Sequence, residues 1–337
     1  MIKEAIAKLI ENKDLTPKET REVFEEIFEK KATPSQISAF LVALKKKGET
    51  YQEISAAAKV VREKAKRVKI NRNRPLLDTC GTGGSKTNKF NISTAVAFVV
   101  ASAGVRVAKH GNRGASSRCG SADVLEVLGI DLSLPSSTME EALRKIGIAF
   151  LYAPLYHSSF AVVAPIRREL GITTIFNILG PLCNPGFPTH QLLGVFSPDL
   201  VLKLANALGV LGVKRAFVVY GEDVKDEISL TGKTLVGFLD KKRVRKLYLS
   251  PSSFGLRRCT LKDLQVNNVE ESAKVILDIF AGKGGAPQDI VLANASACFY
   301  ILNRVKNLKE GVELAKSLII QGKVREKFSA FKDFLAK

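Results

Sequence analysis

The sequence has no tryptophan, two methionines and three histidines, and its five cysteines form no CxxC pair. A zinc site or a disulfide framework is therefore not expected, and isolated cysteines of this kind are typical of a protein of the reducing cytoplasm. The longest apolar run, 95–105, is about half of the ~20 residues that a membrane-spanning helix needs. An integral membrane protein is excluded on that ground.

Acidic residues are also scarce, with 33 Asp and Glu against 52 Lys and Arg, so the formal net charge is +19. A positive field of this size attracts anions, and both phosphate-bearing metabolites and nucleic acids fit that description. Apolar residues make up 46% of the chain and charged residues 25%, which is close to the globular average and excludes disorder. The 337 residues allow two domains, or one large α/β unit with an appendage.

The first seventy residues predict a small helical domain. Capping boxes at 16–19, 33–36 and 50–53 each place a Thr three residues before a Glu or Gln, so that hydroxyl and carboxyl or amide groups can satisfy free backbone N–H groups. Apolar residues with a helical period follow the first two boxes. A basic run, 59–74, then leads to Pro75, and a solvated helix face and an anion-facing surface are both open interpretations of it.

After Pro75 the chain alternates between predicted strands and helices. Such alternation is typical of a mostly parallel sheet covered by helices. We therefore expect an α/β protein with a helical domain at 1–72 and an α/β domain at 73–337. The expected strands lie at 76–78, 105–108, 148–151, 192–196, 216–220 and 234–238. The expected helices include 95–103, capped by Ser93 or Thr94, 121–128, and 139–146 with a capping box at 138–141.

A glycine-rich segment with Gly81, Gly83 and Gly84 lies between a predicted strand and a predicted helix. Glycines there allow backbone N–H groups to face an anion at close range, and the helix adds its positive N-terminal end. A tight structural turn is the alternative interpretation. The hydroxyl-rich segment 91–94 at the helix start favours the anion site, because two anion-binding devices would converge.

A cationic segment, 109–113, follows the next strand, at the point where α/β sheets place ligands. Lys109, His110, Asn112 and Arg113 suit an anionic substrate, although a purely structural loop is the alternative. The donor-rich sequence continues with Gly114, Ser116, Ser117, Gly120 and Ser121.

An acidic pair, Asp226 and Glu227, follows the predicted strand 216–220. Carboxylates beyond a strand end in a basic protein predict Mg²⁺ held by oxygen ligands, and an ordinary acidic turn is the alternative. Neither a GxSxG motif nor a Ser-His-Asp or Cys-His pattern stands out. The expected chemistry is therefore positioning and charge stabilisation rather than covalent catalysis.

Taken together, six motifs resemble the anthranilate phosphoribosyltransferase family, in the family's order and over nearly the whole chain. They are CGTGG at 80–84, FNIST at 90–94, KHGNR at 109–113, CGSADVLEVLG at 119–129, FNILGPLCNP at 176–185 and the Asp226-Glu227 pair. The resemblance implies a transferase that joins anthranilate to phosphoribosyl pyrophosphate and releases pyrophosphate, in tryptophan biosynthesis. It also implies a fold shared with nucleoside phosphorylases, a helical domain completed by helices within about 160–187, and a homodimer formed through that domain.

The same resemblance implies three sets of site residues. Phosphoribosyl pyrophosphate would be held by Gly81, Gly83, Gly84, Ser85, Asn91, Ser93, Thr94, Lys109 and Ser121. Anthranilate would be lined by Gly81, His110, Asn112, Arg167, Gly180 and Pro181, with Arg167 on its carboxylate. Magnesium would be bound by Ser93, Asp226 and Glu227.

The sequence departs from the family pattern at a few positions. Ser85 stands where the family usually has Asp, Val224 and Lys225 replace a usual Gly-Leu, and Thr173 replaces a usual Arg. A catalytically altered relative that binds nucleic acid through basic runs such as 241–246 is the competing interpretation, and a nucleoside phosphorylase is a third. The retained Arg167 and LGPL segments favour the transferase.

Overall fold

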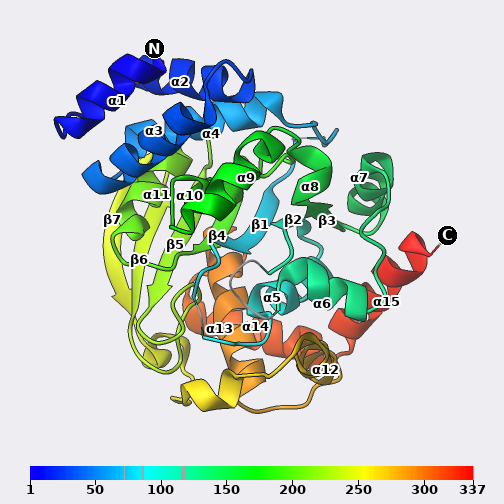
Figure 1. Ribbon diagram of the computed structural model, residues 1–337. Helices are drawn as coiled ribbons and strands as arrows, with labels where there is room; N and C mark the ends of the chain where they lie inside the picture. Colours follow the sequence, from blue (N-terminus) through cyan, green and yellow to red (C-terminus); the bar gives the residue numbers. More distant parts are fainter. Residues whose placement is uncertain (72, 86, 115–118, 337) are drawn as a thin grey trace.

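The computed structural model describes residues 1–71, 73–85, 87–114 and 119–336. Its centre is a seven-stranded sheet in the order β3-β2-β1-β4-β5-β6-β7 (Figure 1). The strands are β1 (Leu76–Gly81), β2 (Arg106–Gly111), β3 (Ile148–Tyr152), β4 (His190–Gly194), β5 (Arg215–Gly221), β6 (Thr234–Asp240) and β7 (Arg243–Leu249). The strands from β3 to β5 pair in parallel, whereas β6 and β7 are antiparallel. The prediction of an α/β protein with a mostly parallel sheet is confirmed.

Helices cover both faces of this sheet. The first four are α1 (Ile2–Ile10), α2 (Pro17–Phe28), α3 (Pro34–Lys47) and α4 (Tyr51–Lys64). The middle of the chain contributes α5 (Ile92–Ser102), α6 (Ser121–Val127), α7 (Ser136–Lys145), α8 (Ala153–Tyr156), α9 (Phe160–Leu170), α10 (Phe176–Leu179) and α11 (Leu200–Val210). The last four are α12 (Val269–Phe280), α13 (Ala286–Ile301), α14 (Leu308–Ile320) and α15 (Lys323–Leu335).

The three predicted capping boxes are present at the starts of α2, α3 and α4. In the first, the N–H of Glu19 donates to Thr16 Oγ1 at 3.2 Å, and the N–H of Thr16 donates to Glu19 Oε2 at 2.7 Å. The other two boxes, at Thr33 and Thr50, have the same reciprocal bonds. Each box satisfies two backbone donors that the first turn leaves free, which stabilises the helix start by about 1 kcal/mol.

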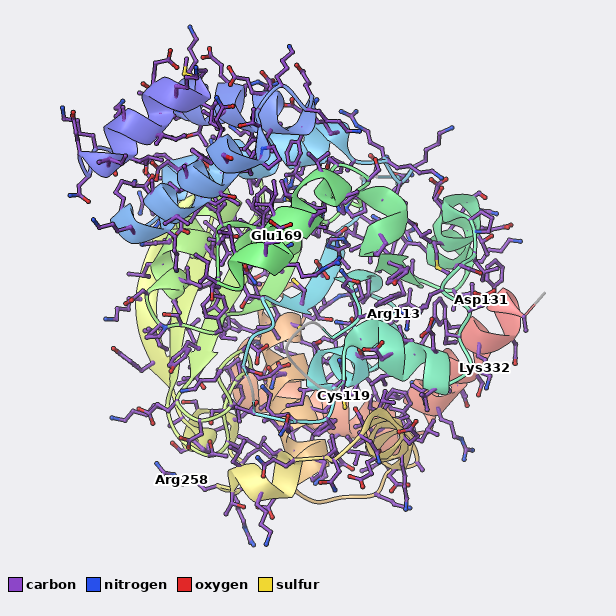
Figure 2. The ribbon with its side chains drawn as sticks, in the orientation of Figure 1. Arg113, Cys119, Asp131, Glu169, Arg258 and Lys332 are labelled. Atoms are coloured by element: carbon purple, nitrogen blue, oxygen red, sulfur yellow. The ribbon has the colours of Figure 1, made fainter. Side chains whose placement is uncertain are left out.

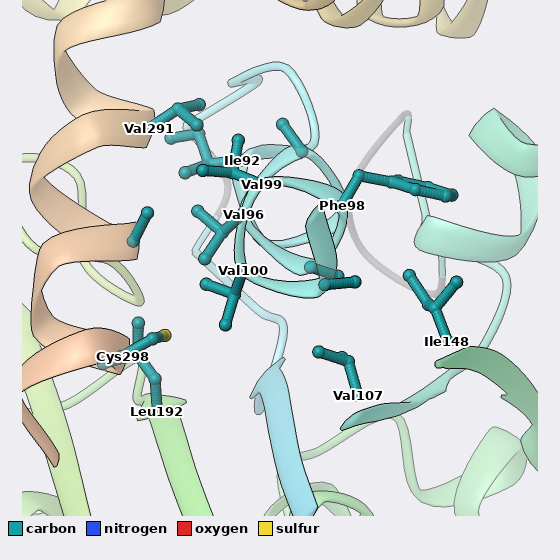
Figure 3. Packing of buried hydrophobic residues seen from close by; sticks show 14 of the residues in the cluster. Ile92, Val96, Phe98, Val99, Val100, Val107, Ile148, Leu192, Val291 and Cys298 are labelled. Atoms are coloured by element: carbon teal, nitrogen blue, oxygen red, sulfur yellow. The ribbon is translucent and has the colours of Figure 1, made fainter. Parts of the chain in front are cut away.

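Two hydrophobic cores lie on opposite faces of the sheet, because adjacent strand residues point to opposite sides. Leu192 packs into a core with α5 and α12 to α15, whereas its neighbour Leu193 packs into a core with α1 to α4 and α9 to α11. Figure 3 shows the first core, in which Val96 and Val100 of α5 lie between Val291 of α13 and the sheet. The apolar run 95–105 is explained by this burial, since residues 95–101 are all buried.

The sheet changes winding direction between β1 and β4. From β1 the chain adds β2 and β3 on one side, and then returns to place β4 on the other side of β1. Ligands of open α/β sheets bind beyond the carboxyl ends of the strands at such a switch point. The glycine segment that follows β1 lies at this position.

Two sequence-based expectations about helix starts are wrong, and one strand was not expected. Helix α5 is capped by Asn91, whose Oδ1 accepts from the N–H of Thr94, rather than by Ser93 or Thr94. Helix α7 begins at Ser136 after Pro135, without the predicted capping box, because the helix starts before Thr138. The basic run 241–246 lies largely in β7, where Arg245 stacks on Phe238 at 5.2 Å. Among the helices described, none is long and apolar enough to cross a membrane.

Candidate functional site

The glycine segment is fixed at the carboxyl ends of β1 and β4. The N–H of Thr82 donates to the carbonyl of Gly194 at 2.9 Å, and Thr82 Oγ1 accepts from the N–H of Phe196 at 3.1 Å. Gly83 and Gly84 have φ angles of +66° and +80°, a region that L side chains rarely adopt. The chain therefore needs glycine at these two positions to make its turn over the edge of the sheet.

The predicted acidic pair lies directly against this segment. A Cβ atom at Gly81 would be 3.2 Å from Asp226 Oδ2, and a Cβ atom at Gly194 would overlap the backbone carbonyl of Asp226. Both glycines thus leave room for the segment that follows β5. The structure brings Gly81 and Asp226 together although they are 145 positions apart in the sequence.

Asp226 forms a shielded ion pair that the sequence did not suggest. Lys89 Nζ lies 2.7 Å from Asp226 Oδ1 and donates to the carbonyl of Val224 at 2.6 Å. The side chains of Lys89 and Asp226 are 7% and 14% exposed. Sequence reasoning missed Lys89, and the only signal was its place between the glycine segment and the FNIST motif.

Glu227 is held in an environment that disfavours its charge. Burial, and then the neighbouring carboxylate of Asp226, raise the pKa of Glu227 to about 8, against opposing contributions from Lys89, Lys109 and the backbone of Ser93. In the described part of the chain no three His, Cys, Asp or Glu side chains are grouped to hold a metal. The pair offers hard oxygen ligands and negative charge, which suits Mg²⁺ completed by substrate oxygens and water.

Lys109 lies beneath the start of α5 and is only 3% exposed. Its Nζ donates to the carbonyl of Thr79 at 2.6 Å and to Ser93 Oγ at 2.9 Å. Burial lowers the pKa of Lys109, and the carboxylate of Asp78 is the largest opposing influence. Lys109 therefore fixes the hydroxyl of Ser93 at the helix N-terminus and adds positive charge under the site.

The loop after β2 is tied to α6. Ser121 Oγ donates to the carbonyl of Asn112 at 3.4 Å, and Arg113 forms ion pairs with Asp123 and Glu126. Figure 2 shows Arg113 beside this helix. Arg113 is thus occupied by acids of the protein itself. Ser116 and Ser117, which the sequence suggested as further donors, lie outside the described residues.

A second group of predicted residues is connected through aromatic rings. His110 Nδ1 donates to the carbonyl of Gly180 at 3.2 Å, and the ring of His110 lies 5.1 Å from the ring of His157. The ring centroid of Phe160 lies 5.5 Å from that of His157, and the ring centroid of Phe176 lies 5.8 Å from that of Phe160. The four rings form one continuous row from β2 to α10, the aromatic surface, of which His110, His157 and Phe176 are buried and Phe160 is half-buried.

Arg167 extends this surface with a cation. Its guanidinium lies over the ring of Phe176 at 5.8 Å, and burial lowers the pKa of Arg167. None of the ion pairs between described residues includes Arg167. Even Glu169, an acid on the same helix α9, forms no ion pair with it (Figure 2). A half-buried guanidinium next to aromatic rings is suited to a planar carboxylate that brings its own ring.

Asp78 connects the two groups. The N–H of His110 donates to Asp78 Oδ1 at 3.1 Å, and Gln191 Nε2 lies 3.3 Å from Asp78 Oδ2. The same amide of Gln191 donates to the carbonyl of Pro181 at 2.7 Å. Strands β1, β2 and β4 and the turn at Gly180 and Pro181 are therefore held as one unit. The bonds found for Asn112 lead to Arg113 and α6, and none joins it to Arg167 within the described residues.

The buried histidines predict how stability depends on pH. Burial lowers the pKa of His110 to about 3 and that of His157 to about 4, from an ordinary value of 6.5. Below pH 6.5 these histidines bind protons in the unfolded chain but stay neutral in the folded chain. Their contribution to the free energy of unfolding is therefore fully present above pH 6.5 and is lost as the pH falls. We expect His157→Phe to lessen this loss by about 1.4 kcal/mol per pH unit below pH 6. Urea unfolding at several pH values between 7 and 5 measures the free energy of unfolding of both proteins. The same pH dependence in the two proteins would contradict the burial of a neutral His157.

Comparison with known proteins connects this geometry to a family. Residues 73–325 match the α/β domain of a glycosyl transferase family, and residues 3–65 match the helical bundle domain of such a family. The anthranilate phosphoribosyltransferase of Petrotoga mobilis is 47% identical over 329 residues, which cover 98% of this chain and 95% of the relative. That of Acetivibrio thermocellus is 47% identical over 334 residues, covering 99% of this chain and 96% of the relative.

Solved structures agree with the sequence comparison. The anthranilate phosphoribosyltransferase of Thermus thermophilus has a TM-score of 0.93 and 40% identity, with 99% of each chain covered. The Saccharomyces cerevisiae enzyme, solved in complex with phosphoribosyl pyrophosphate and Mg, has a TM-score of 0.89 and 28% identity, with 99% of this chain and 98% of that chain covered. The chain described here belongs to the anthranilate phosphoribosyltransferase family.

Proposed function

We propose that this chain transfers the phosphoribosyl group of phosphoribosyl pyrophosphate to anthranilate, giving N-(5-phosphoribosyl)anthranilate and pyrophosphate in tryptophan biosynthesis. The observation that carries the proposal is that Asp78 and Gln191 connect two groups of complementary residues through β1, β2 and β4. The glycine segment and the Asp226-Glu227 pair suit a metal-bound diphosphate, whereas the aromatic surface that ends at Arg167 suits an aromatic carboxylate.

The phosphoribosyl pyrophosphate site uses backbone donors and the start of α5. Free N–H groups of the glycine segment and the positive N-terminal end of the helix favour phosphate oxygens. Lys109 supports this site from below through its bond to Ser93 Oγ. The proposed residues are Gly81, Gly83, Gly84, Ser85, Asn91, Ser93, Thr94, Lys109 and Ser121.

Mg²⁺ would be held by Ser93, Asp226 and Glu227. Their oxygens fit a hard divalent cation, and Gly81 allows the carboxylate of Asp226 to lie directly against the glycine segment. Structures of the Saccharomyces cerevisiae relative contain Mg, in one case with phosphoribosyl pyrophosphate. When bound, the cation neutralises charge on the diphosphate oxygens.

Anthranilate would lie on the aromatic surface with its carboxylate at Arg167. The planar guanidinium can donate two parallel hydrogen bonds to a carboxylate. His110 is neutral at pH 7 because burial lowers its pKa to about 3, so it lines the path as a polar ring rather than as a cation. Gly81, Asn112, Gly180 and Pro181 complete the proposed lining.

The reaction needs positioning more than a nucleophilic side chain. The anthranilate nitrogen forms a bond to C1 of the ribose while the bond from C1 to the diphosphate oxygen breaks. The nitrogen then loses its extra proton to solvent, and the bonding electrons leave with pyrophosphate. An aromatic amine is already neutral at pH 7, so the chain needs no strong base. Backbone donors and Lys109 stabilise the charge that grows on the leaving group.

Arg167 is the residue that the proposal assigns to substrate recognition. Arg167→Ala is expected to raise the KM for anthranilate by about 10- to 100-fold, because a charged hydrogen-bonded pair contributes about 1.5–3 kcal/mol. The KM for phosphoribosyl pyrophosphate should change by less than threefold. Arg168→Ala, on the exposed side of the same helix, serves as the control. Steady-state kinetics with each substrate varied in turn make the comparison, and an unchanged KM for anthranilate would remove Arg167 from the site.

Loss of anthranilate fluorescence tests the reaction itself. Purified protein, phosphoribosyl pyrophosphate and Mg²⁺ are mixed with anthranilate, and each component is omitted in turn. The proposal requires a fluorescence decay that depends on all of them, with N-(5-phosphoribosyl)anthranilate as product. No decay at any temperature would make the departures at Ser85, Val224 and Lys225 disabling, and salt-dependent DNA binding would be measured next.

Assembly and domain division remain part of the proposal. We propose a cytoplasmic homodimer formed through the helical domain, which light scattering tests. Helices α9 and α10 share a hydrophobic core with α1 to α4, which supports a helical domain of 1–72 completed by helices within 160–187. The remainder, from 73 to 337, forms the phosphoribosyl pyrophosphate domain.

A further inference from the structure

Lys89 is a buried cation placed on a carboxylate that the proposed function assigns to Mg²⁺. Its Nζ lies 2.7 Å from Asp226 Oδ1, and the two side chains are 7% and 14% exposed. The same ammonium donates to the carbonyl of Val224 at 2.6 Å and lies 3.5 Å from Ser85 Oγ. Lys89 thus reaches from the acidic segment to the glycine segment.

The backbone around Lys89 is fixed, so only the side chain can change partner. Lys89 forms an antiparallel bridge with Gln265, and the N–H of the next residue, Phe90, donates to the carbonyl of Leu264 at 3.1 Å. Phe90 is buried in the core. The backbone of Lys89 is therefore held in place, whereas its long, flexible side chain can move the ammonium from one partner to another.

One carboxylate oxygen cannot serve the ammonium and a divalent cation equally well. Two cations close to Asp226 would repel each other, so metal binding at Asp226 weakens the ion pair to Lys89. A largely buried ammonium that loses its counter-charge is costly unless another anion replaces it. The contact to Ser85 Oγ leads toward the glycine segment, where the diphosphate of the substrate would lie.

We propose that Lys89 is an exchangeable counter-ion, which holds Asp226 in the ligand-free protein and passes to the substrate diphosphate when a divalent cation binds Asp226. The inference rests on the proposed function, because it takes the metal and the diphosphate from it. Lys89 then opposes metal binding to the free protein and favours it once the diphosphate is present. The result is positive coupling between the two ligands, reciprocal as linkage requires.

Replacement of Lys89 by a neutral residue should therefore shift two affinities in opposite directions. Without substrate, Lys89→Met should bind Mn²⁺, used as a spectroscopic probe for Mg²⁺, about tenfold more tightly than the unsubstituted protein. At saturating Mn²⁺ and without anthranilate, the variant should bind phosphoribosyl pyrophosphate about tenfold more weakly. Each change corresponds to ~1.4 kcal/mol. Electron paramagnetic resonance titration measures the first constant, and isothermal calorimetry measures the second.

Lys225→Met is the matched control, since it removes the same charge from the neighbour of Asp226. Lys225 Nζ donates to Tyr220 Oη at 2.9 Å and to the carbonyl of Glu222 at 3.0 Å, and neither bond leads to the carboxylate of Asp226. Both constants should change by less than threefold in this variant. Equal effects of the two substitutions would reduce the role of Lys89 to net charge and overturn the inference.

Lys89→Gln separates charge from structure, because its amide can still donate to the carbonyl of Val224. The inference requires Lys89→Gln to behave like Lys89→Met, with tighter Mn²⁺ and weaker phosphoribosyl pyrophosphate. Behaviour like the unsubstituted protein would overturn it and leave Lys89 as a hydrogen-bond donor only. If the unsubstituted protein binds no Mn²⁺ with or without phosphoribosyl pyrophosphate, the proposed metal site fails and the inference with it. Normal Mn²⁺ binding that Lys89→Met leaves unchanged overturns the inference alone.

Discussion

Replacement of both acidic residues, Asp226→Asn with Glu227→Gln, is expected to lower kcat/KM by at least about a thousandfold, because it removes the charge that would bind the metal of the diphosphate. The dependence on Mg²⁺ should disappear together with the activity. The protein should remain folded, but its unfolding midpoint should fall, because Asp226→Asn leaves the largely buried ammonium of Lys89 without its counter-charge. Glu227→Gln should not add to this loss. Burial and the carboxylate of Asp226 raise the pKa of Glu227 to about 8, so the ionised form of Glu227 opposes folding, and a neutral amide of the same shape relieves that cost.

The anthranilate fluorescence assay over a range of Mg²⁺ concentrations measures the effect, and the thermal unfolding midpoint reports on folding. Asp223→Asn is the control, since Asp223 is exposed in the same turn. It should retain full activity. A double variant that keeps Mg²⁺-dependent turnover would place the metal elsewhere. A double variant that is already unfolded at the assay temperature would show that the lost activity reflects lost folding rather than lost metal binding.

Local features of this fold could be predicted from the sequence, because they depend on neighbouring residues. The capping boxes at Thr16, Thr33 and Thr50 depend on a hydroxyl and a carboxyl or amide three residues apart, and all three are present. The same spacing at 138–141 gives no box, because α7 begins two residues earlier. The glycine segment after β1 follows equally from local pattern, since Gly83 and Gly84 adopt backbone angles that other residues avoid. Motif order was sufficient to predict the family.

Contacts between distant segments could not be predicted in this way. The ion pair between Lys89 and Asp226 joins residues 137 apart, and it exists because β1 and β5 end at the same edge of the sheet. Strand β7 was missed because it is an exposed edge, so its basic residues show none of the apolar alternation of a buried strand. The cap of α5 was also mispredicted, because the hydroxyl of Ser93 accepts a hydrogen bond from Lys109 and Asn91 caps the helix instead.

Loss of the ammonium of Lys109 is expected to have the second large effect. In Lys109→Met the hydroxyl of Ser93 and the carbonyl of Thr79 lose their donor, and Asp78 loses its main neighbouring positive charge. We expect kcat/KM for phosphoribosyl pyrophosphate to fall at least about a hundredfold, the size typical for removal of one group that stabilises transition-state charge. The KM for anthranilate should change far less, because the hydrogen bonds found for the Lys109 ammonium lead to Thr79 and Ser93, and none leads to Arg167 within the described residues. The free energy of unfolding should also fall by about 3 kcal/mol, because the substitution leaves the buried carboxylate of Asp78 without the positive charge of Lys109.

Arg106→Met separates the site effect from the general loss of a cation. Arg106 lies on the same strand, but at the opposite end, where it donates to the carbonyls of Asn71 and Arg74. Both variants lower the net charge by one, so a difference between them isolates position. Kinetics should be measured well below the unfolding temperature of each variant, so that lost stability is not counted as lost activity. Equal losses for both substrates in Lys109→Met would refute the assignment, because a cation beneath the start of α5 must act on the diphosphate before it acts on anthranilate.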